Sequence, residues 1–138
     1  ELEADPALLP GAIEEMLRWS TPLHHFRRTA TRDCEIAGQP VRENDRVVLL
    51  YTSANFDEAV FADPMRFDIR RNPNPHLAFG HGIHLCLGAN LARLEARIFF
   101  EEFFRHFTGI EATGEARRIR SNLVNGHKYM PVRLHPRT

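Results

Sequence analysis

Residues 79–88 read Phe79-Gly80-His81-Gly82-Ile83-His84-Leu85-Cys86-Leu87-Gly88 and place one cysteine in a glycine-rich loop before a strongly helical segment. The next residues, 89–97, contain no proline or glycine and are rich in good helix formers. Cys86 therefore lies near a helix start, where free backbone N–H groups and the helix dipole favour negative charge. Such an environment favours the thiolate, which is the form that attacks electrophiles and binds metals. The stretch predicts a thiolate ligand at Cys86.

The pattern Phe-Gly-x-Gly-x-His-x-Cys-x-Gly resembles the haem-binding loop of the cytochrome P450 family, the haem-thiolate monooxygenases. In that family the cysteine is the proximal iron ligand, and its thiolate pushes electron density onto the iron and favours O–O cleavage. The resemblance implies haem b (iron protoporphyrin IX) as the cofactor and Cys86 as the metal ligand and catalytic residue. It also implies that an aromatic ring shields the thiolate, that a histidine reaches a propionate and that glycines let the backbone approach the porphyrin. These residues are Phe79, His84, Gly80, Gly82 and Gly88.

A second motif lies in a helix predicted over residues 6–20, where Glu15 and Arg18 are spaced i, i+3 and share one face. From the residues alone, a solvated surface pair and a pair between Arg18 and Glu14 at i, i+4 are open alternatives. The motif resembles the Glu-x-x-Arg helix of the same family, in which an arginine from a later meander completes the pair. Arg66 matches that arginine. The resemblance implies a buried structural network that fixes the geometry of the cysteine loop.

Further residues correspond to the surroundings of the haem in the family. Arg28 matches an arginine that pairs with a haem propionate, and the neighbouring Arg27 competes for that role. The resemblance also places residues 23–26 and the tip of a predicted C-terminal hairpin near the substrate. The candidates for substrate contact are Leu23, His24, His25, Phe26, Leu123 and Val124.

Histidines close to the cysteine raise a rival interpretation, a zinc site. The chain has eight histidines, and His76, His81 and His84 precede Cys86 within one segment. Structural zinc sites usually contain a second pair of closely spaced ligands, whereas the other cysteine, Cys34, is isolated in a strand-like piece. The glycine positions have no purpose in a zinc site, so haem ligation is favoured. Two distant cysteines also provide no disulfide framework.

The composition limits the partners. The chain has 18 basic and 18 acidic residues, and this zero net charge argues against nucleic acid as a general partner. We find no run of 18 or more apolar residues and no signal-like segment, so we expect a cytoplasmic protein that does not enter a membrane. The 138 residues, 43% of them hydrophobic, are expected to form a single domain over 1–138. The resemblance covers only the C-terminal part of the family fold, with the upstream helical body absent.

The pattern of residues predicts a mainly α fold with small β-hairpins (α+β), as in the C-terminal part of the cytochrome P450 fold. A short helix is expected over 52–60, an irregular meander up to Pro75 and a long helix to about Phe107. Strands are expected within 26–37 and over 46–51, with Asn44 in the left-handed region of the intervening turn. Asn125-Gly126 predicts the turn of a hairpin between 119–124 and 129–134.

Apolar residues cover more than one stripe of the long helix, which predicts burial on most of its sides. Burying one phenylalanine is worth roughly 1.5–3 kcal/mol, so leaving several exposed favours association. We expect a homo-oligomer or a partner chain that covers this helix, with coverage by the hairpins as the alternative. The residues concerned are Leu91, Leu94, Ile98, Phe99, Phe100, Phe103, Phe104 and Phe107.

The resemblance implies a monooxygenase that inserts one oxygen atom of O2 into a small organic substrate. The two electrons would come from a ferredoxin-type or other donor, for which Arg70, Arg71, Arg93 and Arg97 are candidates for a basic docking patch. Two alternatives stay open: a truncated haem-binding or haem-sensing module, and a non-catalytic interaction fragment.

Overall fold

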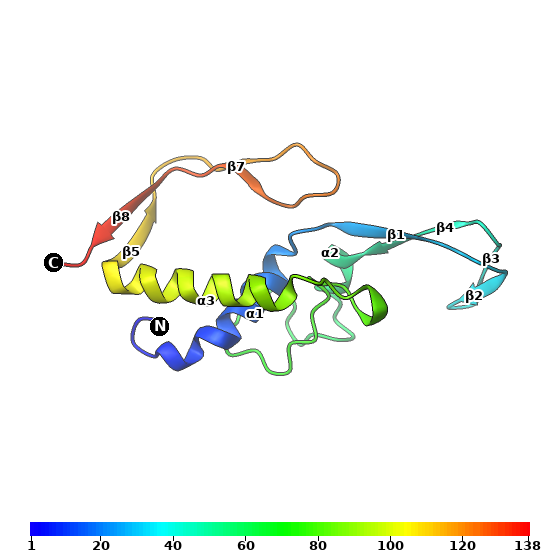
Figure 1. The fold of residues 1–138 in the computed structure, drawn as a ribbon, viewed down its shortest axis with the longest axis horizontal. Helices are drawn as coiled ribbons and strands as arrows, with labels where there is room; N and C mark the ends of the chain where they lie inside the picture. The colour runs from blue at the N-terminus through cyan, green and yellow to red at the C-terminus, as the bar shows by residue number, and fades with distance from the viewer.

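The computed structural model describes all residues 1–138 and has two helices packed against each other near its centre (Figure 1). Helix α1 spans Leu9–Ser20 and follows a short 3₁₀ turn, η1, at Pro6–Leu8, whereas helix α3 spans Ala89–His106. Small two-stranded sheets extend outward from this pair of helices (Figure 1). The architecture is the predicted mixture of helices and small hairpins.

The local sequence determines both ends of the first helical segment. At its start Asp5 caps η1 by accepting a backbone N–H at 3.2 Å, and Pro10 lies in the first turn of α1, where helix N–H groups have no acceptor. At its end Thr21 adopts the left-handed region with φ 37°, and Pro22 follows. Helix α1 therefore ends with the Thr21 side chain turned into the protein, where it is fully buried.

Two antiparallel hairpins follow α1. Strand β1, His25–Thr29, pairs with β4, Arg46–Leu50, and strand β2, Cys34–Ile36, pairs with β3, Gln39–Val41. Strands β1, β2 and β4 agree with the predicted extended segments, whereas β3 lies outside them. Cys34 is exposed.

Two turns in these hairpins use left-handed backbone. Asn44 has φ 71°, as its residue type predicts. The two-residue loop between β2 and β3, Ala37 and Gly38, has φ values of 49° and 79°, the combination of a type I′ turn. Glycine adopts this region without strain, whereas an alanine does not.

Helix α2 is only one turn, Tyr51–Ala54, so the helix predicted over 52–60 is wrong in length. The Asp57 side chain accepts the Ala59 N–H at 2.9 Å, and this local bond replaces a continuing helix. An irregular meander follows, as predicted, and it leads to a second 3₁₀ turn, η2, at Gly82–His84.

The C-terminal prediction was wrong in its pairing. Strand β5, Phe107–Ala112, pairs with β8, Val132–Pro136, and the shorter β6, Arg117–Arg118, pairs with β7, His127–Tyr129. Asn125-Gly126 is therefore not a tight turn between two long strands.

The physical reason is that Asn125 is used elsewhere. Its side-chain amide donates to the Ser20 carbonyl at 2.6 Å, and its N–H donates to the Pro22 carbonyl at 2.8 Å. These bonds dock the wide loop between β6 and β7 onto the end of α1.

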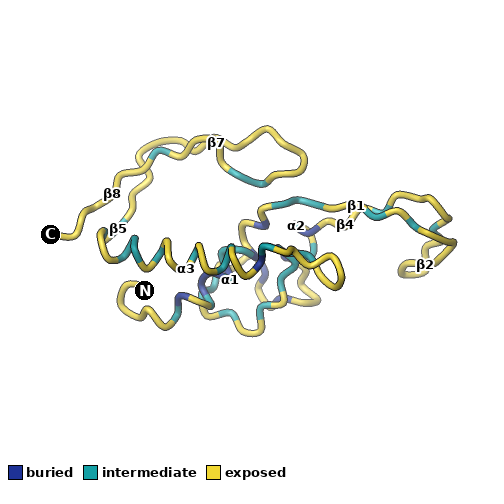
Figure 2. The backbone as a smooth tube through the Cα atoms, viewed as in Figure 1, coloured by how far each residue is buried: buried dark blue, intermediate teal, exposed yellow.

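Few residues are buried, and they lie mainly where α1 meets α2, the meander and the start of α3 (Figure 2). Leu9, Ala12 and Ile13 provide the apolar part contributed by α1. The largest fully buried side chains, in contrast, are polar. They are Glu15, Arg18, Thr21 and Asn55.

Helix α3 is not covered in the way that its apolar sequence predicts. Leu91 is 58% exposed and Phe99 is 61% exposed, although Phe100, Phe103 and Phe104 are half-buried and stack on neighbouring rings. The alternative that the hairpins cover this helix is thus wrong for its outer face. Association through this face stays a prediction.

None of the helices has both the length and the apolar character needed to cross a lipid bilayer.

The turn at Ala37 generates the first prediction. Replacing Ala37 with asparagine should stabilise the β2–β3 hairpin by about 0.5–1 kcal/mol, because asparagine tolerates the left-handed region better than alanine. Urea unfolding combined with hydrogen exchange of the hairpin amides measures the change. Ala4→Asn, at an exposed position without positive φ, is the matched control. An equal effect of both substitutions would contradict the strain argument.

Candidate functional site

The cysteine loop depends on glycine at two positions. Gly80 and Gly82 have φ values of 74° and 65°, in the left-handed region. A Cβ at Gly80 would lie 3.2 Å from the Tyr51 hydroxyl and 3.3 Å from the His84 carbonyl oxygen, which is closer than real Cβ contacts usually come. Gly82, in contrast, has no atom within 4 Å of the position of a Cβ and faces open space. Gly88 has an ordinary φ of −84° and is the N-cap of α3.

Cys86 is exposed between this loop and α3. Its N–H donates to the Phe79 carbonyl at 2.9 Å, and its own carbonyl accepts the Ala89 N–H at 3.1 Å. The N–H groups of Leu87 and Gly88, which directly follow the cysteine in the chain, have no acceptor within the chain. The loop therefore fixes the backbone of the cysteine and leaves its thiol open to a ligand.

Exposed apolar residues flank Cys86 along the same loop. Ile83 and Leu87 are almost fully exposed, and Leu85 is more than half exposed. Exposed apolar groups at an open thiol favour an apolar ligand over water.

The two residues predicted to bind propionates are free of acidic partners. The Arg28 guanidinium donates to the Arg27 carbonyl at 3.0 Å and forms no ion pair. Because side chains alternate along β1, Arg28 shares a face with Phe26, whose ring lies 5.8 Å from that of Tyr51. This face of β1 leads toward Gly80, and it favours Arg28 over Arg27 as the arginine predicted to pair with a propionate. His84 lies in η2 and is exposed.

Glu15 and Arg18 form the predicted pair, and both side chains are completely buried. The Arg18 Nε and NH2 groups donate to the two carboxylate oxygens, each at 2.8 Å. Arg18 also donates to the backbone carbonyls of Asn55, Pro64 and Arg66 at 2.8, 3.0 and 3.2 Å. One guanidinium thereby joins α1, the end of α2 and the meander.

The arginine that completes this pair is Arg71, and the prediction of Arg66 was wrong. Arg71 Nε lies 3.2 Å from a Glu15 carboxylate oxygen, and its other nitrogens donate to the carbonyls of Ala62, Asp63 and Arg66. The Arg66 side chain is exposed, and only its carbonyl faces the network. In an irregular meander no periodicity tells which of two arginines points inward, so the spacing could not decide.

Glu15 accepts further bonds from the Asp68 N–H at 2.8 Å and from the Asn74 side-chain amide at 3.1 Å. Burial alone would raise the pKa of Glu15, but the Arg18 and Asp68 hydrogen bonds outweigh it and hold this pKa below its ordinary value. The network is therefore built around a permanent carboxylate.

A second carboxylate, Glu14, joins α1 to α3, a contact that sequence reasoning missed. The Arg93 Nε and NH2 groups donate to its oxygens at 2.7 and 2.8 Å, and His76 Nε2 lies 3.0 Å from one of them. The Arg93 guanidinium also lies 4.8 Å above the ring centre of Phe79. Glu14 is thus not a partner of Arg18, and the alternative pairing is wrong.

Charge and burial shift the pKa values in this cluster. The Arg93 hydrogen bond lowers the pKa of Glu14, and the same bond raises that of Arg93. Burial lowers the pKa of His76, despite the opposing attraction of Glu14. His76 is therefore held mainly as a neutral ring, and its Nδ1 accepts the Ala78 N–H at 3.2 Å.

The proposed basic patch is largely neutralised. Arg71 is bonded to Glu15, Arg93 to Glu14, and Arg97 lies 3.6 Å from Glu101. Of the four candidate arginines, Arg70 alone forms no ion pair within the chain, and docking of an electron donor at this patch stays a prediction. Nor do the histidines assemble a zinc site, because no three His, Cys, Asp or Glu side chains are arranged to hold a metal ion.

Residues predicted to contact substrate come together from two distant parts of the chain. Leu23 and Val124 form an antiparallel bridge, and the His24 N–H donates to the Leu123 carbonyl at 2.8 Å. His25 and Phe26 continue from there into β1. The docked loop between β6 and β7 thus lies beside the entry to β1.

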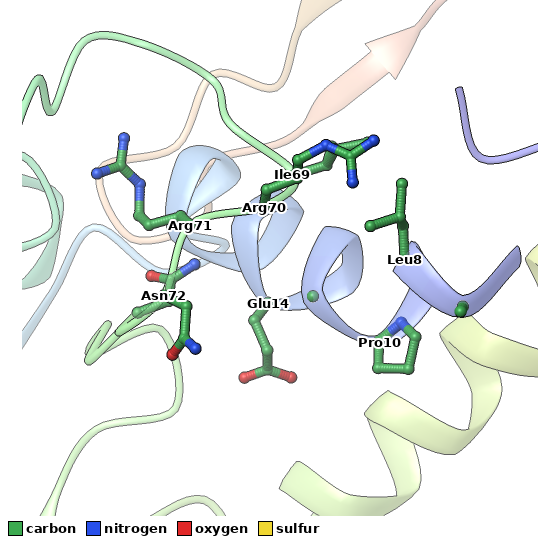
Figure 3. Close-up of a pocket in the computed structure, with 10 residues that line it drawn as sticks. Leu8, Pro10, Glu14, Ile69, Arg70, Arg71 and Asn72 are labelled. Carbon is green, nitrogen blue, oxygen red and sulfur yellow. The ribbon is translucent and has the colours of Figure 1, made fainter. Parts of the chain in front are cut away.

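The structure also has a hollow between the start of α1 and residues 69–74, shown in Figure 3. Pro10, Glu14 and Arg71 are among its lining residues, whereas the loop 79–88 contributes none. This hollow lies against the two carboxylate networks and is separate from the Cys86 loop.

The fold agrees with comparisons to known proteins. The model of the family described as "Cytochrome P450" matches residues 5–126. The chain belongs to the cytochrome P450 family, and its mixture of helices and small sheets is a part of that fold.

Relatives and solved structures match along nearly the whole chain. The chain is 50% identical over 126 residues to a methyl-branched lipid omega-hydroxylase of Mycobacterium tuberculosis, covering 91% of this chain and 29% of that protein. It is 46% identical over 138 residues to a steroid C26-monooxygenase of the same species, covering 98% of this chain and 35% of that protein. The crystal structure of CYP108D1 from Novosphingobium aromaticivorans superposes with a TM-score of 0.94 at 44% identity, covering 99% and 33%. The chain thus spans about a third of the length of these proteins.

The position of Arg71 generates a prediction about stability. Arg71→Ala should lower the free energy of unfolding by about 1.5–3 kcal/mol, because it removes charge-assisted bonds from a buried carboxylate. Arg66→Ala keeps the backbone carbonyl and should change it by less than about 0.5 kcal/mol. Urea unfolding of both variants decides the matter. A larger loss for Arg66→Ala would restore that residue as the partner.

The lowered pKa of His76 generates a prediction about pH. An unfolded histidine titrates near about 6.5. Below that pH the unfolded chain binds a proton that the folded chain resists, so stability should fall as the pH is lowered from 7 to 5. His76→Asn should flatten this slope by up to about 1.4 kcal/mol per pH unit. Urea unfolding of this variant and of the wild type over the same pH range measures the two slopes. Parallel slopes for His76→Asn and wild type would contradict the assignment.

Proposed function

We propose that this chain is the haem-binding part of a cytochrome P450 monooxygenase, with Cys86 as the iron ligand. The observation that carries the proposal is the exposed Cys86 thiol, in a loop that Gly80 and Gly82 hold in left-handed backbone at the start of α3. A thiolate is the ligand type expected at such a helix start.

The residues of the loop fit a flat, apolar cofactor with an anionic edge. The space beside Gly82 is open, and the exposed apolar side chains of Ile83, Leu85 and Leu87 accompany the thiol. When bound, haem would supply the iron centre at which dioxygen is activated.

The chain's own residues would bind and tune this group. Cys86 would supply the axial thiolate, and the unpartnered N–H groups of Leu87 and Gly88 would stabilise the negative charge of its sulfur. Arg28 and His84, both without acidic partners, would pair with the propionates. Phe79, held under Arg93, would exclude water from the sulfur.

The reaction class is supported by the relatives, one of which is named a hydroxylase and another a monooxygenase. We infer the insertion of one oxygen atom into a small organic substrate, with electrons from a ferredoxin-type or other donor. Within this chain, the bridged residues around Leu23 and Val124 would contact the substrate.

The experiment that tests the proposal is a haem titration followed by the spectrum of the reduced, CO-bound form. A strongly red-shifted Soret band requires thiolate ligation, so wild type should show it and Cys86→Ser should lose it. Cys34→Ser removes the other exposed thiol and is the matched control, which should keep the band. A band that survives in Cys86→Ser, or its absence in the wild type, would overturn the proposal. Turnover with a surrogate oxidant then separates a catalyst from a haem-binding module.

A further inference from the structure

Asn55 is a fully buried polar residue that lies outside the predicted site. Its Nδ2 donates to the Thr21 hydroxyl at 2.8 Å, its Oδ1 accepts the Leu77 N–H at 2.7 Å, and its backbone carbonyl accepts an Arg18 NH1 bond. One residue therefore bonds to the end of α1, to the buried guanidinium and to the segment that leads into the cysteine loop.

We propose that Asn55 is a positioning residue, which fixes where the cysteine loop lies relative to α1. The bond to Leu77 is the direct connection. Leu77 opens a turn in which its carbonyl accepts the Gly80 N–H at 2.9 Å, and within that turn the Phe79 carbonyl accepts the Cys86 N–H at 2.9 Å. Moving Leu77 therefore moves both the glycine turn and the acceptor that holds the cysteine backbone.

A second contact from the same helical turn supports this assignment. Tyr51 and Asn55 are spaced i, i+4 and lie on one face. Tyr51 is buried and its hydroxyl lies close to Gly80, so the turn 77–80 meets α2 at two points. At its first residue the turn donates a hydrogen bond, and at its last residue it lies beside the Tyr51 hydroxyl, which would be 3.2 Å from a Cβ at Gly80.

Thr21 separates this role from a merely structural one. Thr21 shares the Asn55 amide bond and donates to the Arg18 carbonyl at 2.6 Å, but it does not contact the loop. Thr21→Ala therefore removes buried polar bonds while leaving the Leu77 N–H with its acceptor. A residue that only stabilises the fold would behave like Thr21.

The test compares Asn55→Ala, Thr21→Ala and Ser53→Ala, an exposed control on the same helix. Hydrogen exchange of the Leu77 and Cys86 amides is measured in the haem-free chain, with the free energy of unfolding from urea. Asn55→Ala should speed both amides by about tenfold or more beyond the effect of lost global stability. Thr21→Ala should change them only in proportion to stability, and Ser53→Ala should change nothing. Equal exchange in Asn55→Ala and Thr21→Ala at matched stability would overturn the proposal.

If Asn55→Ala does not fold, Asn55→Asp replaces it, because aspartate keeps the oxygen that accepts the Leu77 N–H and loses the amide donor. Cys86 should then remain as protected as in Thr21→Ala, and additional loss of protection would overturn the proposal.

The inference rests on the proposed function only in treating Cys86 as the haem ligand. With haem bound, Asn55→Ala should also convert part of the red-shifted CO band to a form without thiolate ligation, whereas Thr21→Ala should not. The exchange measurement needs no haem. If the chain bound no haem, the proposed function would be refuted, but hydrogen exchange would still decide the role of Asn55.

Discussion

The carboxylate of Glu15 is the constraint on which the rest of the structure depends. A fully buried charge is tolerated only when hydrogen bonds replace its hydration, and Glu15 obtains them from Arg18, Arg71, Asn74 and the Asp68 N–H. The meander between α2 and the cysteine loop has no regular secondary structure. Its path is set instead by the need to bring these donors to one carboxylate and its carbonyls to Arg18.

This constraint explains how a chain with so few buried apolar residues can hold a defined loop. The largest side chains without solvent exposure are Glu15, Arg18, Thr21 and Asn55, and their bonds are directional. A polar network of this kind adds little net stability for its size, but it specifies one arrangement, because displacing any member leaves a buried group unsatisfied. Asn55 connects this network to the Cys86 loop, because its side-chain oxygen accepts the Leu77 N–H.

The sequence was most informative where chemistry requires a residue type at a fixed spacing. The left-handed backbone at Asn44 and the pair of Glu15 with Arg18 could be predicted. The family comparison agrees with the fold class that the cysteine motif indicated. The choice of Arg71 over Arg66 could not be predicted, because it depends on how an irregular segment turns in three dimensions. The same limit applies to Asn125, whose sequence indicates a tight turn but whose side chain docks onto Ser20.

Two adjacent carboxylates of α1, Glu14 and Glu15, hold different segments next to the cysteine loop. Glu15 faces the meander, whereas Glu14 faces α3 and binds Arg93, which lies over Phe79. One helix thus holds the segment before Cys86 and the helix after it. Because Phe79 accepts the Cys86 N–H, both sides converge on the backbone of one residue. The loop is therefore held by the ion pairs of Glu14 and Glu15 and not by contacts at the sulfur. The Cys86 thiol can then remain open to a ligand while the loop keeps its position.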